Sequence, residues 1–166
     1  MLAQACSVSE RVPAAASDRT APLIVGFDGS TSAIAAVTWA AASGASIIVV
    51  RVLPPLPAGV DRRPIEQGDA SLVFGGHAHD AARRLEGCAW RPELVEASSQ
   101  SAGLAAAARR HEASAIVVGA HGRRQHSGII GTEPHQILST ADVPVIVIPP
   151  QAGARLLHDN GGRSRL

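Results

Sequence analysis

The sequence contains no lysine, because all 15 of its basic residues are arginine. A Walker-type phosphate loop needs a lysine that reaches the β- and γ-phosphates. A Schiff-base enzyme needs a lysine nucleophile, and a protein kinase needs its strand lysine. The absence of lysine therefore excludes these three classes of protein.

Aromatic residues make up only 2% of the chain, and the formal net charge is +1. A stacking surface for single-stranded nucleic acid needs aromatic rings. The arginines also occur as scattered pairs rather than as one basic run, so we expect no nucleic-acid partner. The two cysteines, Cys6 and Cys88, lie far apart, which argues against a disulfide framework or a zinc site. We expect no metal at His77 and His79 either, since residues two apart on a helix point in different directions.

No stretch approaches the roughly 18 apolar residues of a transmembrane helix. The first residues also lack the basic start and apolar core of a signal peptide. We therefore expect a cytoplasmic protein that does not contact a membrane. The 166 residues fit one domain, which we expect over 22–149. The expected flexible extensions are 1–21 and 150–166, since neither end shows hydrophobic periodicity.

Between these ends, short apolar runs alternate with helical patterns. The apolar runs predict strands at 22–28, 46–53, 93–98, 114–120 and 143–149. The patterns between them predict helices at 30–44, 101–113 and 134–141, and a weaker helix over 69–87 that is interrupted by Gly75 and Gly76. Such alternation is typical of a parallel sheet with right-handed crossovers, and continuous apolar strands indicate helices on both faces. The predicted fold class is α/β, with a five-stranded parallel sheet.

Ligands of such sheets bind at the carboxyl ends of the strands. Asp28 closes the first predicted strand and Gly119 closes the fourth. From Gly119 the chain continues as GAHGRRQHSGIIGT, up to Thr132. Glycines let backbone N–H groups approach an anion, and the helix that starts near Thr132 adds the positive end of its dipole. The stretch indicates a phosphate-binding loop, although Gly119 also suits close packing of a strand against a helix.

Three features together resemble the universal stress protein family. The first strand continues as IVGFDGSTSA, the fourth opens into a Gly-x-x-Gly spacing that is later closed by Gly131 and Thr132, and the last strand reads ADVPVIVIP. The resemblance covers about residues 22–149. It implies a Rossmann-like open twisted sheet with strand order 3-2-1-4-5. It also implies an ATP site, which some members of the family have.

The residues that this resemblance assigns to the nucleotide share a place at the strand ends or in the loop after the fourth strand. They are Asp28, Val52, Gly119, Gly122, Arg123, Gly131 and Thr132. Asp28 would face adenine and ribose, and Val52 would contact adenine through its backbone. The glycines would let the loop pass close to ribose and phosphates, and Thr132 would bind phosphate. Arginine pairs well with phosphate, which suits Arg123. ATP is the expected cofactor, with Mg²⁺ left open.

Two features depart from the family's ATP-binding pattern. Eight residues, rather than nine, separate Gly122 from Gly131, and Glu133 brings a carboxylate to the start of the helix. Three functions therefore stay open. The first hypothesis is a stress-response regulatory protein that binds ATP or a related adenine nucleotide with little or no turnover and has no catalytic residues. The second is a dimeric interaction module of the same fold that binds no nucleotide, and the third is an enzyme of the related adenine-nucleotide α-hydrolase group.

The last predicted strand is apolar and would lie at the edge of the sheet. Exposed edge strands invite pairing with another chain. Pro144 stands at the start of this strand, where it blocks little. We therefore expect a homodimer that forms through residues 143–148.

Overall fold

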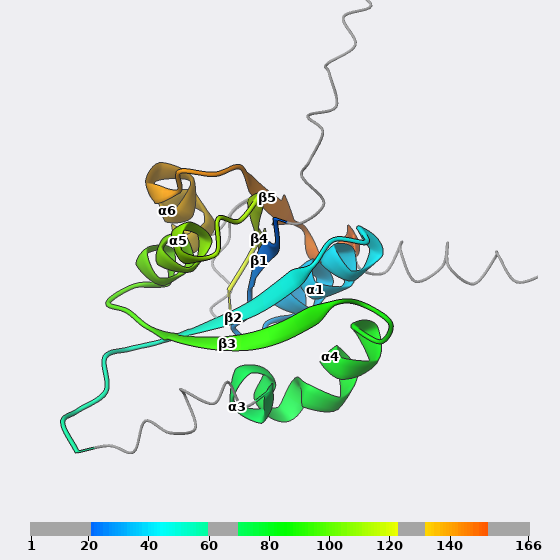
Figure 1. The fold of residues 1–166 in the computed structure, drawn as a ribbon, viewed down its shortest axis with the longest axis horizontal. Helices are drawn as coiled ribbons and strands as arrows, with labels where there is room; N and C mark the ends of the chain where they lie inside the picture. Colours follow the sequence, from blue (N-terminus) through cyan, green and yellow to red (C-terminus); the bar gives the residue numbers. More distant parts are fainter. Residues whose placement is uncertain (1–20, 60–69, 123–131, 153–166) are drawn as a thin grey trace, which may run out of the picture.

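A computed structural model describes residues 21–59, 70–122 and 132–152. Five parallel strands form one sheet in the order β3-β2-β1-β4-β5 (Figure 1), which confirms the expected fold class and strand order. In chain order the elements are β1 (Leu23–Gly26), α1 (Thr31–Ala42), β2 (Ile47–Leu53), α3 (Ala70–Phe74), η1 (Gly75–His77), α4 (Ala78–Arg84), β3 (Trp90–Glu96), α5 (Gln100–Arg110), β4 (Ala115–Gly119), α6 (Thr132–Thr140) and β5 (Val145–Ile148). The extensions expected at 1–21 and 150–166 lie almost wholly outside the described residues.

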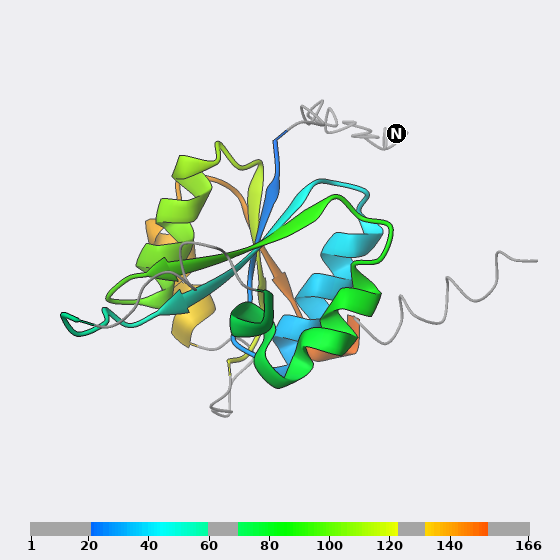
Figure 2. The same ribbon diagram turned by 60° about the horizontal axis from the view of Figure 1, so that its bottom comes forward.

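Helices cover both faces of the sheet, as Figure 2 shows, with α5 and α6 on one side and α1, α3 and α4 on the other. The register places Ile24 beside Ile48 and Ile116, and all three side chains are buried under α5 and α6. The next residue along each of these strands faces α1 instead. Because successive side chains of a strand point to opposite faces, a continuous apolar run contributes side chains to the hydrophobic core on each face of the sheet.

The third strand begins earlier than predicted, at Trp90 instead of residue 93, and it ends at Glu96. Pro92 lies inside it, and a proline has no N–H to give to a sheet. Among the described strands, β3 lies at the edge of the sheet and pairs with β2 alone. Ile47 N–H donates to Ala89 O and Ala97 N–H donates to Leu53 O, so the odd-numbered residues of β3 bond to β2. Pro92 therefore turns its nitrogen to the open edge, where no donor is needed.

The weaker helix predicted over 69–87 is three short segments, α3, η1 and α4. The predicted interruption at the glycine pair is confirmed, since α3 ends where Gly75 adopts a φ of 54°. Arg51 of β2 supports this end, because its Nη1 donates to the carbonyl oxygens of Leu72 and Val73, each at 3.2 Å. The last carbonyls of a helix have no partner within the helix. Arg51 thus fastens α3 to the sheet.

Helix α5 lies very close to the sheet because two glycines leave it room. A Cβ atom on Gly103 would stand 2.6 Å from Cγ2 of Val52, and one on Gly26 would stand 2.9 Å from Cδ1 of Leu104. The helix starts at a defined point, since Ser99 Oγ accepts the N–H of Ala102 at 3.1 Å. The beginning of α5 is therefore held next to the carboxyl ends of β1 and β2.

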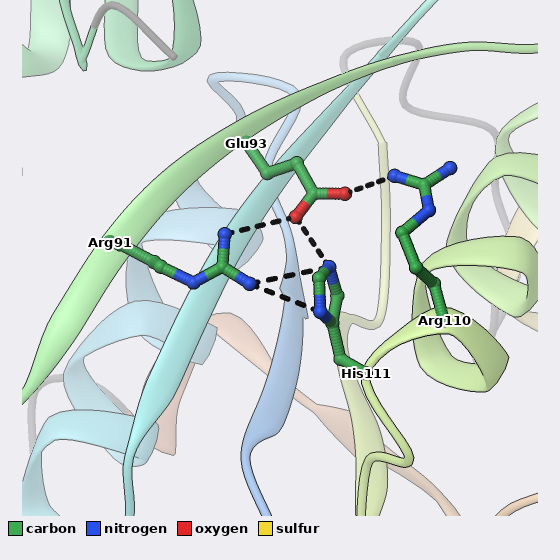
Figure 3. Close-up of polar contacts among 4 residues, drawn as sticks. All are labelled: Arg91, Glu93, Arg110 and His111. Carbon is green, nitrogen blue, oxygen red and sulfur yellow. Dashed lines mark hydrogen bonds and ion pairs between the residues drawn. The ribbon is translucent and has the colours of Figure 1, made fainter. Parts of the chain in front are cut away.

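The other end of α5 is joined to β3 by the carboxylate of Glu93, shown in Figure 3. Arg110 Nη1 and His111 Nε2 each lie 2.6 Å from a different oxygen of this carboxylate, and Arg91 Nη1 lies 3.3 Å from it. Arg91 Nη2 is 3.1 Å from Nδ1 and 3.3 Å from Nε2 of His111. Arg91 is thus held against the His111 ring as well as against the carboxylate. Glu93 is thus the anion that holds three cation-forming side chains together.

Replacing Glu93 with glutamine should destabilise the protein, because two arginines would then lie close together without a counter-charge. The Glu93 side chain is only 12% exposed, while the arginines are more than half exposed. We expect the free energy of unfolding, measured with urea, to fall by about 1–2 kcal/mol.

The matched control is Asp142→Asn, which breaks the exposed pair of Asp142 with Arg109 (69% and 58% exposed). This change should cost less than about 0.5 kcal/mol. Equal losses in the two variants would show that the Glu93 cluster contributes no more than a surface ion pair.

Candidate functional site

The turn from β1 into α1 is built by Asp28, Gly29 and Ser30. The Asp28 Oδ1 atom accepts the N–H of Ser30 at 2.9 Å, and Gly29 has a φ of 83°, a conformation that favours glycine. Ser30 is the N-cap of α1, where its Oγ accepts the N–H of Ala33 at 3.1 Å. This local hydrogen bonding holds the Asp28 carboxylate at the carboxyl end of β1.

A hydrogen bond joins this turn to the loop that follows β4. Ser30 Oγ donates to the carbonyl oxygen of His121 at 3.2 Å, across 91 positions of sequence. β1 and β4 are neighbours in the sheet, so their carboxyl ends already lie side by side. The hydrogen bond fixes the distance between Asp28 and the start of the loop at Gly122.

Gly119, the last residue of β4, lies directly against the first turn of α1. A Cβ atom at this position would stand 2.5 Å from the Ser32 carbonyl carbon and 2.8 Å from the Ala33 nitrogen. Real Cβ atoms do not come so close to a backbone. Gly119 is therefore required for the packing of α1 on the sheet, which supports the packing interpretation of this glycine whether or not a ligand binds.

Replacing Gly119 with alanine should destabilise the fold by about 1–3 kcal/mol, because backbone atoms of α1 must move to admit the methyl group. The free energy of unfolding in urea measures this loss. Gly76→Ala is the matched control, since a Cβ there would meet nothing within 4 Å. Equal stability of the two variants would contradict the proposed packing role of Gly119.

A hollow of about 370 Å³, part of it open to solvent, lies between the ends of β1 and β4 and the helices α5 and α6. The residues around it are Gly26, Phe27, Asp28, Ser30, Ala33, Gln100, Leu104, Val118, Gly119, His121, Gly122, Pro134 and Ile137. The hollow thus combines an apolar lining with a few polar groups, as is typical of sites that bind a flat organic ring.

A second, wider hollow of about 950 Å³ of mostly open space lies at the beginning of α1. Ser30, His121 and Gly122 line both hollows, so the two meet at these residues. The first turn of α1 contains no acidic side chain. The first N–H groups of a helix have no partner within the helix, and they lie at the positive end of its dipole. The second hollow is therefore favourable to an anion.

The structure brings together three of the residues assigned from the sequence, since Asp28, Gly119 and Gly122 all line the first hollow. Val52 does not line it, because its side chain packs into the core against the backbone of α5 at Gly103. Thr132 is the exposed first residue of α6 and is not among the lining residues. Arg123 and Gly131 lie outside the described residues, so their predicted roles stay predictions.

Gln100 lines the hollow but was not assigned from the sequence. It is the first residue of α5, the helix that follows β3, so it lies at the same edge of the sheet as Asp28. Its place after the N-cap Ser99 was the available signal. In a doubly wound fold the helix after each strand begins at the ligand-binding edge.

Within residues 21–59, 70–122 and 132–152, no three His, Cys, Asp or Glu side chains gather in a way that could hold a metal ion. Helices in this part of the chain are also too short or too polar to cross a membrane. The features that remain are a parallel α/β sheet and a crevice at the carboxyl ends of its central strands, which define the doubly wound α/β class of proteins.

A family model described as the universal stress protein family matches residues 20–149. The chain belongs to this family. No protein of curated function matches the sequence.

Solved structures give the same assignment. A universal stress family protein from Burkholderia pseudomallei is 30% identical, with 80% of this chain and 98% of that chain covered and a TM-score of 0.53. The universal stress protein of Archaeoglobus fulgidus, solved in complex with dAMP, is 25% identical, with 77% and 97% covered and a TM-score of 0.56. Another universal stress protein, in complex with cAMP, shares the fold at 21% identity, with 77% and 96% covered and a TM-score of 0.59.

Proposed function

We propose that this protein is a cytoplasmic regulatory protein that binds ATP or a related adenine nucleotide in the crevice between β1 and β4, with little or no turnover. The observation that carries the proposal is the hollow that Asp28, Gly119 and Gly122 share with an apolar lining. The Archaeoglobus fulgidus relative, which was solved with dAMP, adds support for an adenine nucleotide.

The chemistry of the crevice suits the parts of a nucleotide. The apolar side chains of Leu104 and Ile137 would pack against the base. A carboxylate accepts hydrogen bonds from hydroxyl groups, so Asp28 would hold the ribose. Phosphates would extend along the loop after Gly122, where we assign them to Arg123, Gly131 and Thr132. Val52 would contribute a backbone contact to adenine.

The described polar groups of the crevice already have structural roles, which favours binding without turnover. Asp28 Oδ1 forms the turn, while Ser30 caps α1 and bonds to the carbonyl of His121. Hydrolysis needs a general base within hydrogen-bond reach of the attacking water. Groups that are occupied in holding the crevice open serve binding better than proton transfer.

Asp28→Asn should weaken nucleotide binding, because the amide keeps the turn to Ser30 and loses the charge that attracts ribose hydroxyls. We expect the dissociation constant of a fluorescent ATP analogue to rise about tenfold, in the range lost with one charge-assisted hydrogen bond. Asp142→Asn makes the same chemical change at an exposed residue between α6 and β5, which pairs with Arg109 of α5. This control variant should leave the dissociation constant unchanged.

Two results would overturn the proposal. One is the lack of saturable binding by the wild-type chain, which would favour a dimeric interaction module that needs no nucleotide. The other is binding that is the same in Gly131→Val and in the wild type. Phosphate release in the same samples distinguishes a binder from an enzyme, and multiple turnovers per minute would favour the α-hydrolase hypothesis.

We further propose that two copies pair through β5, which has β4 as its neighbour in the sheet and leaves its other side as an edge. Val145, Ile146 and Val147 are partly exposed there. Ile116 N–H donates to Pro144 O and Ala120 N–H donates to Ile148 O, so the even-numbered residues bond to β4. Val145 and Val147 therefore turn their N–H and C=O groups to the open edge, where a second copy can bond to them.

Val147→Pro should abolish this dimer and leave the sheet intact, because the N–H that it removes points away from β4. Light scattering at micromolar concentration should give twice the chain mass for the wild type and the chain mass for the variant. Val147→Thr, which keeps the N–H, is the matched control and should remain dimeric. A monomeric wild-type protein would contradict the proposed pairing.

A further inference from the structure

The polar side chains around the first hollow differ in how far they are already hydrogen-bonded. Asp28 accepts the Ser30 N–H, and Ser30 Oγ both caps α1 and donates to His121 O. Asp28 and His121 have further interactions as well. In contrast, the Gln100 carboxamide makes no hydrogen bond to any residue that the structure describes. Gln100 lines the hollow, and the donor and the acceptor of its carboxamide are both available.

Close packing of α5 fixes where Gln100 lies. Gly103 touches Val52 near the end of β2, and Leu104 touches Gly26 at the end of β1. Gln100 precedes these residues by about one helical turn, so it projects beyond the strand ends on the same face of the helix. Leu104 lines the hollow together with Gln100. A ring that packs on Leu104 therefore lies within reach of Gln100.

A carboxamide matches one base better than the others. Its oxygen accepts one hydrogen bond and its amino group donates another, side by side. Adenine presents the complementary pair on one edge, with the N6 amino group as donor and N7 as acceptor. Guanine presents two acceptors, O6 and N7, at the same place. A single carboxamide cannot pair with both in the same geometry.

We propose that Gln100 is the residue that selects adenine over guanine in this crevice, by a bidentate hydrogen bond to N6 and N7 of the base. This assignment rests on the nucleotide-binding function proposed above. Gln100 is a specificity-determining residue that adds side-chain recognition of the base to a site whose other polar side chains hold ribose, phosphate or the crevice itself.

Calorimetric titration of ATP, GTP and 7-deaza-ATP into wild-type protein and Gln100→Leu tests the assignment. The wild type should bind ATP about 5- to 100-fold more tightly than GTP, the discrimination expected of a good bidentate pair. Its affinity for 7-deaza-ATP, which lacks the N7 acceptor, should be lower than for ATP. In Gln100→Leu, ATP affinity should fall to the level of GTP, and ATP and 7-deaza-ATP should bind equally.

Gln136→Leu makes the same change on the exposed face of α6 and should bind all three nucleotides like the wild type. The wild-type comparison of ATP with 7-deaza-ATP keeps the test decisive even if Gln100→Leu folds poorly, since equal affinities there refute the N7 contact. An unchanged ratio of ATP to GTP affinity in Gln100→Leu refutes the role of Gln100 and leaves nucleotide binding standing. No saturable binding of ATP to the wild type refutes both.

Discussion

The crevice depends on how closely helices approach the sheet at positions that carry no side chain. Gly119 lets the first turn of α1 rest on the end of β4, while Gly103 and Gly26 let α5 rest on β2 and β1. In each case a single methyl group would overlap its neighbour. Interiors are packed too densely to absorb such an overlap without moving a whole element. The width of the crevice is therefore set by how closely these glycines let the helices and strands approach each other.

This constraint changes what a glycine motif means in the sequence. Gly119 belongs to the spacing that resembles a nucleotide loop, yet the structure gives it a packing role at α1. The two roles are compatible, because the strand end that must pass close to a helix is also the one next to the crevice. A glycine pattern at a strand end thus indicates close packing of a strand against a helix, and it does not by itself indicate a ligand. Evidence for a ligand has to come from polar groups such as Asp28 and Gln100.

Much of the fold was predictable, since buried parallel strands such as β2 are continuous apolar runs that hydrophobic pattern alone reveals. The start of β3 was not, because Pro92 normally argues against a strand, and only its place at the sheet edge makes it acceptable. Asp28 and Gly122 were predicted because they belong to a motif. Gln100 belongs to none, and its place at the crevice follows from the packing of α5, which depends on contacts far apart in the chain.

The two ends of helix α5 contact two different parts of the molecule. At its end, Arg110 and His111 are bound to Glu93 of β3 (Figure 3), and at its beginning Gln100 reaches the crevice. A helix held in this way is already ordered before any ligand arrives. The entropy of fixing the backbone of Gln100 is thus lost during folding instead of during association, which leaves more of each contact as affinity. The Glu93 ion cluster at the far end of α5 is in this sense a part of the preorganisation of the crevice.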